Sequence, residues 1–182
     1  MIFARESLVL GAAVMVPVLW YVFRRERFGK FWSISLHASA HSDSTKAFGT
    51  GLLAASVLLA VYFQSWLIPK YDYGWPIRLA LWAAVVCLVC LALVPHYEGR
   101  WQGRVHAFTS WVMVVLMSLT LLLQAVYSWY AAESLLALAG FIVQMTLLAV
   151  FYGVQGMYAK FALFQGMYIS VYFLCIGVLG YI

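Results

Sequence analysis

Six stretches of mainly apolar residues, each long enough to cross a bilayer, make up most of the chain. They cover approximately residues 7–23, 47–68, 77–95, 106–130, 134–156 and 161–182. A crossing helix needs about 20 such residues, and none of the stretches shows the two-residue alternation of a membrane barrel strand. The pattern therefore predicts an all-α integral membrane protein, built as a single bundle of six transmembrane helices.

Charged residues are scarce along the whole chain. Of 182 residues, 66% are hydrophobic and only 9% are charged, whereas about a quarter of the residues of a soluble domain are charged. So few polar residues cannot cover a water-soluble globule, which excludes a soluble catalytic domain. Three cysteines, Cys87, Cys90 and Cys175, lie inside apolar segments. This placement argues against a disulfide framework and favours small packed side chains over a redox pair.

Four basic residues follow the first apolar segment, and we name them the basic cluster: Arg24, Arg25, Arg27 and Lys30. Basic residues at a segment end bind anionic lipid headgroups and orient the chain. The net charge of +5 therefore indicates membrane lipids as partners and argues against nucleic acid. The loops on the side of this cluster hold eight of the eleven Lys and Arg residues. This excess predicts that the loops after the first and third segments, loops one and three, are cytoplasmic, with both termini outside, in a bacterial-type inner membrane.

The polar residues gather at the end of the bundle that carries the basic cluster. With six crossings, loops one, three and five share one side of the membrane. All four histidines lie in or next to loops one and three: His37, His41, His96 and His106. Ser35 lies in loop one, and Thr109 and Gln165 lie near helix ends that meet these loops. Polar groups collected at one end of an apolar bundle predict a site there.

His37 and His41 have a His-x-x-x-His spacing, which puts both imidazoles on one face of a helix and suits a shared metal ion. Candidate further ligands come from the region of loop three: His96, Glu98 and His106. If the protein is an enzyme, we predict that Zn or another divalent cation activates water against a lipid ester or amide, with Glu98 or Asp43 as base or further ligand. The alternative is a hydrated, serine-rich loop whose histidines lie at the level of the lipid headgroups.

Two classes of function stay open at this stage. The first is a lipid-associated protein that binds or modifies a headgroup at the polar end. The second is a small transporter or channel, or a non-catalytic subunit of a larger membrane complex or homo-oligomer. Transport would be favoured by a continuous path lined by the polar residues within the segments: Gln64, Ser118, Thr120, Gln124, Gln144 and Thr146. Haem is disfavoured because the histidines lie at segment ends rather than inside facing helices.

Three local patterns occur in a recognisable order. They are a serine-bearing loop before a helix start rich in small residues (FWSISLHASAHSDSTKAFGTGLL), a helix that ends in proline before a loop and a histidine (LALVPHYEGRWQGRVHAFTSWV), and a glutamine near the start of the last helix (KFALFQGMYIS). Together they resemble the bacterial membrane family known as domain of unknown function 998, which is related to the DRAM, SFK and FRAG lipid-associated membrane proteins.

The resemblance implies six helices and a connection with membrane lipids. Carried over by position, the family-like residues are Ser35, Pro95, His106 and Gln165. The chain departs from the family pattern after this glutamine, where Gly166 stands in place of a common arginine. The eukaryotic relatives also place their first loop outside, which is opposite to the orientation that the basic residues predict.

Overall fold

The computed structural model describes residues 2–25, 33–97, 100–154 and 160–182, and all regular secondary structure among them is helical. The elements are α1 (Ile2–Arg25), α2 (Ile34–Ser39), α3 (Ser42–Tyr62), the π-helix η1 (Phe63–Leu67), α4 (Ile68–Tyr71), α5 (Trp75–Leu93), α6 (Trp101–Tyr127), α7 (Ala131–Gly153) and α8 (Phe161–Tyr181). Because α3, η1 and α4 form one continuous span, the described residues contain six helical spans long and apolar enough to cross a membrane. The predicted multi-pass helical membrane protein is confirmed.

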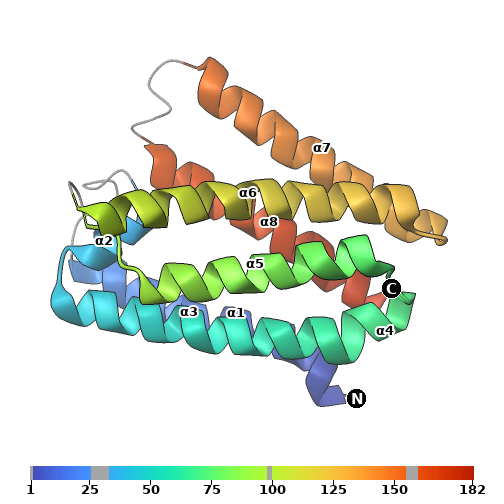
Figure 1. Cartoon of the computed structure of the whole chain (residues 1–182), viewed down its shortest axis with the longest axis horizontal. Helices are drawn as coiled ribbons and strands as arrows, with labels where there is room; N and C mark the ends of the chain where they lie inside the picture. Colours follow the sequence, from blue (N-terminus) through green and yellow to red (C-terminus); the bar gives the residue numbers. More distant parts are fainter. Residues whose placement is uncertain (1, 26–32, 98–99, 155–159) are drawn as a thin grey trace.

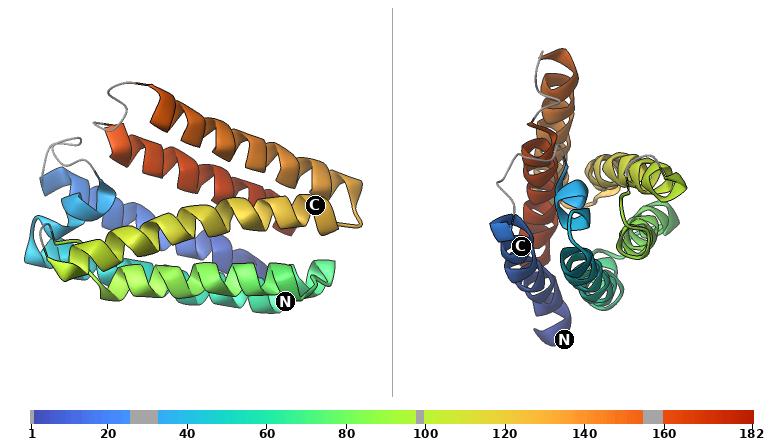
Figure 2. Two further views of the ribbon diagram at one scale, coloured as in Figure 1. Left: turned by 45° about the horizontal axis from the view of Figure 1, so that its top comes forward. Right: turned by 90° about the vertical axis from the view of Figure 1, so that its left-hand side faces the viewer.

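Successive spans pack side by side, α1 on α3, α3 on α5, α5 on α6, α6 on α7 and α7 on α8. Figure 1 shows both termini at one end of the bundle, which we call the terminal end, and α2 at the opposite end, which we call the α2 end. The end-on view in Figure 2 puts α7 at one edge of the bundle, beside α8. The short helix α2 therefore lies where the connections between spans meet.

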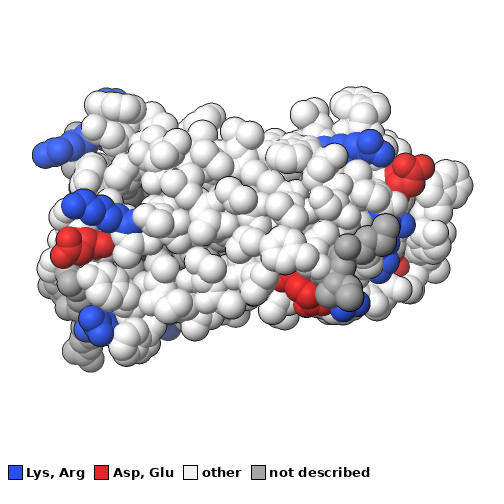
Figure 3. Space-filling view, turned by 90° about the horizontal axis from the view of Figure 1, so that it is seen from below, with Lys and Arg blue, Asp and Glu red and all other residues white. Residues whose placement is uncertain are grey.

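The outer surface of the bundle is apolar between its two ends. On the face drawn in Figure 3, Lys, Arg, Asp and Glu lie near the two ends and the middle carries none. Large apolar side chains with more than 60% of their surface exposed come from several spans: Val57, Leu79, Val115, Leu135 and Leu174. In water such a surface would be unfavourable, whereas lipid tails are as apolar as these side chains.

Several helix ends differ from the predicted segments. Helix α3 begins at Ser42 instead of 47, α6 begins at Trp101 instead of 106, and α2 was not predicted. Hydropathy marks the part of a helix that lies in hydrocarbon, whereas the helix itself continues wherever its backbone can bond internally. Helix α2 starts at a polar signal, because the Ser33 hydroxyl accepts the Leu36 amide at 3.2 Å and caps its first turn.

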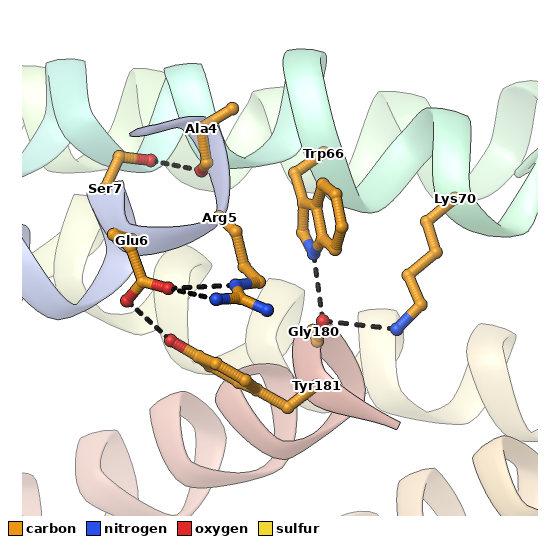
Figure 4. Close-up of polar contacts among 8 residues, drawn as sticks. All are labelled: Ala4, Arg5, Glu6, Ser7, Trp66, Lys70, Gly180 and Tyr181. Carbon is orange, nitrogen blue, oxygen red and sulfur yellow. Dashed lines mark hydrogen bonds and ion pairs between the residues drawn. The ribbon is translucent and has the colours of Figure 1, made fainter. Parts of the chain in front are cut away.

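The terminal end is fixed by side chains that reach helix ends. Figure 4 shows the Trp66 indole donating to the Gly180 carbonyl at 2.9 Å, with the Lys70 ammonium donating to the same oxygen at 3.1 Å. The Tyr181 hydroxyl donates to the Glu6 carboxylate at 2.7 Å. The last carbonyls of a helix have no partner within it, so these donors cap α8 and join it to α1 and the α3–α4 span.

Candidate functional site

Helix α2 is held at its end of the bundle by bonds to two spans. The Ile34 amide donates to the Gln165 side-chain oxygen of α8 at 3.1 Å. On the other side, the Thr45 hydroxyl of α3 donates to the Ala38 carbonyl at 3.1 Å. A helix of six residues is not stable alone, so these contacts decide where its side chains lie.

A serine of α2 and a histidine of α6 are hydrogen-bonded to each other. The ring nitrogen Nε2 of His106 on α6 lies 2.8 Å from the Ser35 hydroxyl oxygen, and Nδ1 lies 2.5 Å from the Val94 carbonyl oxygen. A carbonyl can only accept, so Nδ1 carries the proton of the neutral ring. Nε2 is then the acceptor, and the Ser35 hydroxyl donates to it. His106 is only 3% exposed, so this tautomer is fixed by its two partners.

The Val94 carbonyl is available because α5 ends just before it. Pro95 follows Val94 in the sequence, and a residue that precedes proline is driven away from the helical conformation. Val94 accordingly has φ −114° and ψ 92°. Its carbonyl therefore belongs to no helical turn and accepts from the histidine of the next span.

His96 is a second histidine close to this pair. It lies in the connection between α5 and α6, and its ring centroid is 5.2 Å from that of His106. The same connection packs tightly on α6, since a Cβ at Gly103 would collide with the Tyr97 carbonyl. The histidine pair is thus buried between a loop and the first turns of α6.

Ser35 lies in the wall of two cavities. The larger has a volume of about 100 Å³ and lies among α2, α3, α5, α6 and α8, with a wall that includes Phe48, Leu88, Val114, Phe164 and Gln165. The smaller, of about 10 Å³, is lined by Ser35, His96 and His106 among others. About 10 to 15 Å³ suffices for one water molecule. The smaller cavity is therefore close to the size of a water, whereas the larger could take part of a chain-like apolar molecule.

The predicted shared face of His37 and His41 is wrong. Helix α2 ends at Ser39, and His41 is the residue before α3, with an extended backbone. His37 is buried, with its ring edge-on to Phe23 at 5.1 Å, whereas His41 is exposed. The chain turns between the two helices, so the four-residue spacing does not run along one helix.

The other predicted metal and catalytic residues do not gather around an ion. Among the described residues there is no group of three or more His, Cys, Asp or Glu placed to hold a metal. Both nitrogens of His106 already have partners, so a metal would have to displace Ser35 or Val94. Asp43 is exposed in the first turn of α3, where its negative charge interacts favourably with the helix dipole. Glu98 lies outside the described residues, and the divalent metal stays a prediction.

The remaining predicted site residues divide between the site and its surroundings. Gln165 lines the larger cavity, whereas Thr109 is half-buried on α6 and its neighbour Ser110 lines the cavity instead. In the basic cluster, the Arg24 guanidinium lies over the Trp20 ring, 4.9 Å from its centroid. The side chains of the other three members lie outside the described residues, and lipid binding by the cluster stays a prediction.

The six polar residues predicted for a transport path lie in separate places. Ser118 donates to Gln144 at 3.0 Å between α6 and α7, and Gln124 donates to the Tyr73 hydroxyl at the terminal end. Gln64 and Thr146 are exposed on the outer surface, and Thr120 bonds within its own helix. None of the six lines the larger cavity, and a transport path stays a prediction.

Comparison with known proteins yields no match, whether with family models, curated proteins or solved structures. The resemblance to the family of domain of unknown function 998 therefore stays a prediction. The four family-like residues nevertheless lie together at the α2 end. Ser35 bonds His106, Pro95 follows the carbonyl that His106 bonds, and Gln165 bonds α2.

Proposed function

We propose that the protein binds a membrane lipid at the α2 end, with an acyl chain in the larger cavity and the polar headgroup beside Ser35, His106 and Gln165. The observation that carries this proposal is the composition of the cavity wall. It is mainly apolar along α3, α5, α6 and α8, and its polar side chains include Ser35 on α2, Ser110 on α6 and Gln165 on α8, of which Gln165 is bonded to α2. This arrangement matches an amphipathic molecule that enters with its chain along the bundle.

A lipid chain already lies in an apolar medium, so its binding gains nothing from the hydrophobic effect. The gain comes instead from packing, because side chains around an empty cavity lack contacts on one side and a chain restores them. A chain would enter from the bilayer beside Trp111, which lines the cavity and has 36% of its surface exposed. The headgroup would add polar contacts that set specificity.

Arg24, the first member of the basic cluster, lies at the same end, and the cluster supports an anionic headgroup. The cluster begins at the described end of α1, and Figure 1 places that end of α1 at the α2 end of the bundle. A basic side chain near an anionic leaflet contributes about 1 kcal/mol of attraction. The cluster would concentrate anionic lipid around the cavity without itself forming the pocket.

Two adjacent valines of α6 give a matched test. Val114 lines the cavity, whereas Val115 is 62% exposed on the outer surface. Val114→Phe should fill part of the cavity and lower the lipid retained by the purified protein several-fold, whereas Val115→Phe should retain as much as the wild type. Native mass spectrometry and crosslinking with a photoreactive phospholipid would measure this. Equal retention in both variants, with no crosslink to the cavity wall in the wild type, would refute lipid binding there.

A further inference from the structure

Resting on the proposed lipid binding, we propose that Ser35 is a nucleophile with His106 as its base, and that the protein hydrolyses an acyl ester of a membrane lipid. Three neighbours of the bond between these residues carry the argument: the Val94 carbonyl, the Gln165 carboxamide and the water-sized cavity. Each supplies a requirement of acyl transfer.

The base is already in the state that the reaction needs. The Val94 carbonyl fixes the proton on Nδ1, and the unprotonated Nε2 lies 2.8 Å from the Ser35 oxygen. A serine is activated when a neighbouring base accepts its proton and a third group orients that base. In the well-known triad the third group is a carboxylate, whereas here a backbone carbonyl orients the ring. This orienting group is uncharged, so it stabilises the imidazolium less and predicts a slow enzyme.

A donor for the developing oxyanion lies in the same cavity wall. Gln165 accepts the Ile34 amide through its side-chain oxygen, and no bond from the two N–H donors of its NH₂ group to another described residue is present. Ser110 also lines the cavity, but its single hydroxyl proton goes to the His106 carbonyl at 2.9 Å. Gln165 is thus the side chain that we assign to the oxyanion.

The reaction balances with water as the only co-reactant. Ser35 Oγ attacks the ester carbonyl carbon, its proton passes to Nε2 of His106, and the oxyanion accepts from Gln165. The bond from carbon to the alcohol oxygen then breaks, and the leaving alcohol takes the proton from His106, which leaves an acyl ester on Ser35. Water from the cavity that His106 lines attacks this ester with His106 as base. A fatty acid leaves and the Ser35 hydroxyl is restored.

A long-chain alkyl fluorophosphonate tests the nucleophile directly, because Ser35 would form an oxygen–phosphorus bond as fluoride leaves. Intact mass and peptide mapping should show one adduct on Ser35 in the wild type and none in Ser35→Ala. His106→Gln should label at least about 100-fold more slowly, as expected for loss of a general base. Ser42→Ala is the control, since Ser42 is exposed at the start of α3 and lines neither cavity; it should label like the wild type.

Gln165→Glu separates the oxyanion role from anchoring of α2. The carboxylate can still accept the Ile34 amide but has no N–H to donate, so the variant should fold and label about 100-fold more slowly. Liposomes of phosphatidylglycerol and phosphatidylethanolamine should release fatty acid with the wild type but not with Ser35→Ala. Absence of a Ser35 adduct in a wild type that retains lipid would overturn the nucleophile while the lipid site stands. Labelling without any fatty acid release would overturn the substrate class, and labelling without lipid retention would refute the lipid site.

Discussion

Glu133 is the one buried acid among the described residues, with 1% of its surface exposed. It lies in the first turn of α7 at the terminal end, and its carboxylate accepts from the hydroxyls of Tyr73 and Ser128. Gln124 donates to the Tyr73 oxygen at 3.1 Å. A buried carboxylate that loses a donor is costly, so Tyr73→Phe should destabilise the bundle markedly.

The expected loss follows from the charge of the acceptor. A hydrogen bond to a charged group contributes about 1.5–3 kcal/mol, and a neutral one about 1 kcal/mol. Measured side-chain bonds in membrane proteins average about 0.6 kcal/mol and reach about 1.7 kcal/mol. We therefore expect Tyr73→Phe to lower the free energy of unfolding by about 2 kcal/mol. The control is Tyr71→Phe, whose hydroxyl donates to the neutral Leu179 carbonyl at 2.6 Å and should contribute about 1 kcal/mol or less.

Reversible unfolding in mixed micelles would measure both variants, and a double-mutant cycle with Glu133→Gln would isolate the pair. Burial and the hydrogen bond to Glu133 raise the pKa of Tyr73 above its usual value. The folded state therefore favours the protonated phenol. The contribution of Tyr73 to the free energy of unfolding is complete below about pH 10 and falls as the pH rises further. Above about pH 10 the difference in the free energy of unfolding between the wild type and Tyr73→Phe should therefore decrease. Equal losses in both tyrosine variants, with no coupling to Glu133, would refute the reasoning.

Three further predictions concern topology, lipid and metal. Reporter fusions should place both termini outside and the basic cluster in the cytoplasm, and labelling of both regions from one side would contradict the crossing number or the orientation. Replacing the whole basic cluster by Gln should reduce copurified anionic lipid, at about 1 kcal/mol for each residue, and unchanged lipid content would show that the cluster is merely solvated. Elemental analysis of the purified wild type tests the predicted divalent metal, and a preparation with no stoichiometric Zn, Fe or Mn would end that hypothesis.

The spans could be predicted from the sequence because each is a local pattern of apolar residues of the length that a bilayer requires. Their ends could not, since residues such as those at 101–105 continue α6 beyond the apolar run. Helix α2 was missed for a related reason. It is six residues long, and its position depends on Gln165, which lies 131 residues from its partner Ile34.

The site was predicted only in outline. Counting crossings placed Ser35 and His106 at one end, and the resemblance singled out both, but they are 71 residues apart and nothing local shows that they bond. The pairing depends on where α2 lies and on the carbonyl that Pro95 leaves outside α5. The His-x-x-x-His spacing misled because it assumed one regular element across a turn. Local spacing indicates geometry only inside a continuous helix or strand.

The direction of the Ser35 hydroxyl separates the α2 end from ordinary packing. Serine and threonine in helices usually donate to a carbonyl three or four residues earlier, and several do so here: Ser7, Ser39, Ser56, Ser110, Thr120 and Thr146. Ser35 instead meets a histidine nitrogen of another span. Burying the His106 imidazole is costly unless both of its nitrogens are hydrogen-bonded. The Ser35 hydroxyl has no such need of the histidine, because it could donate to a backbone carbonyl of its own helix instead. The tertiary structure therefore imposes this bond, which is why we assign function to it and not to the carbonyl caps of the terminal end.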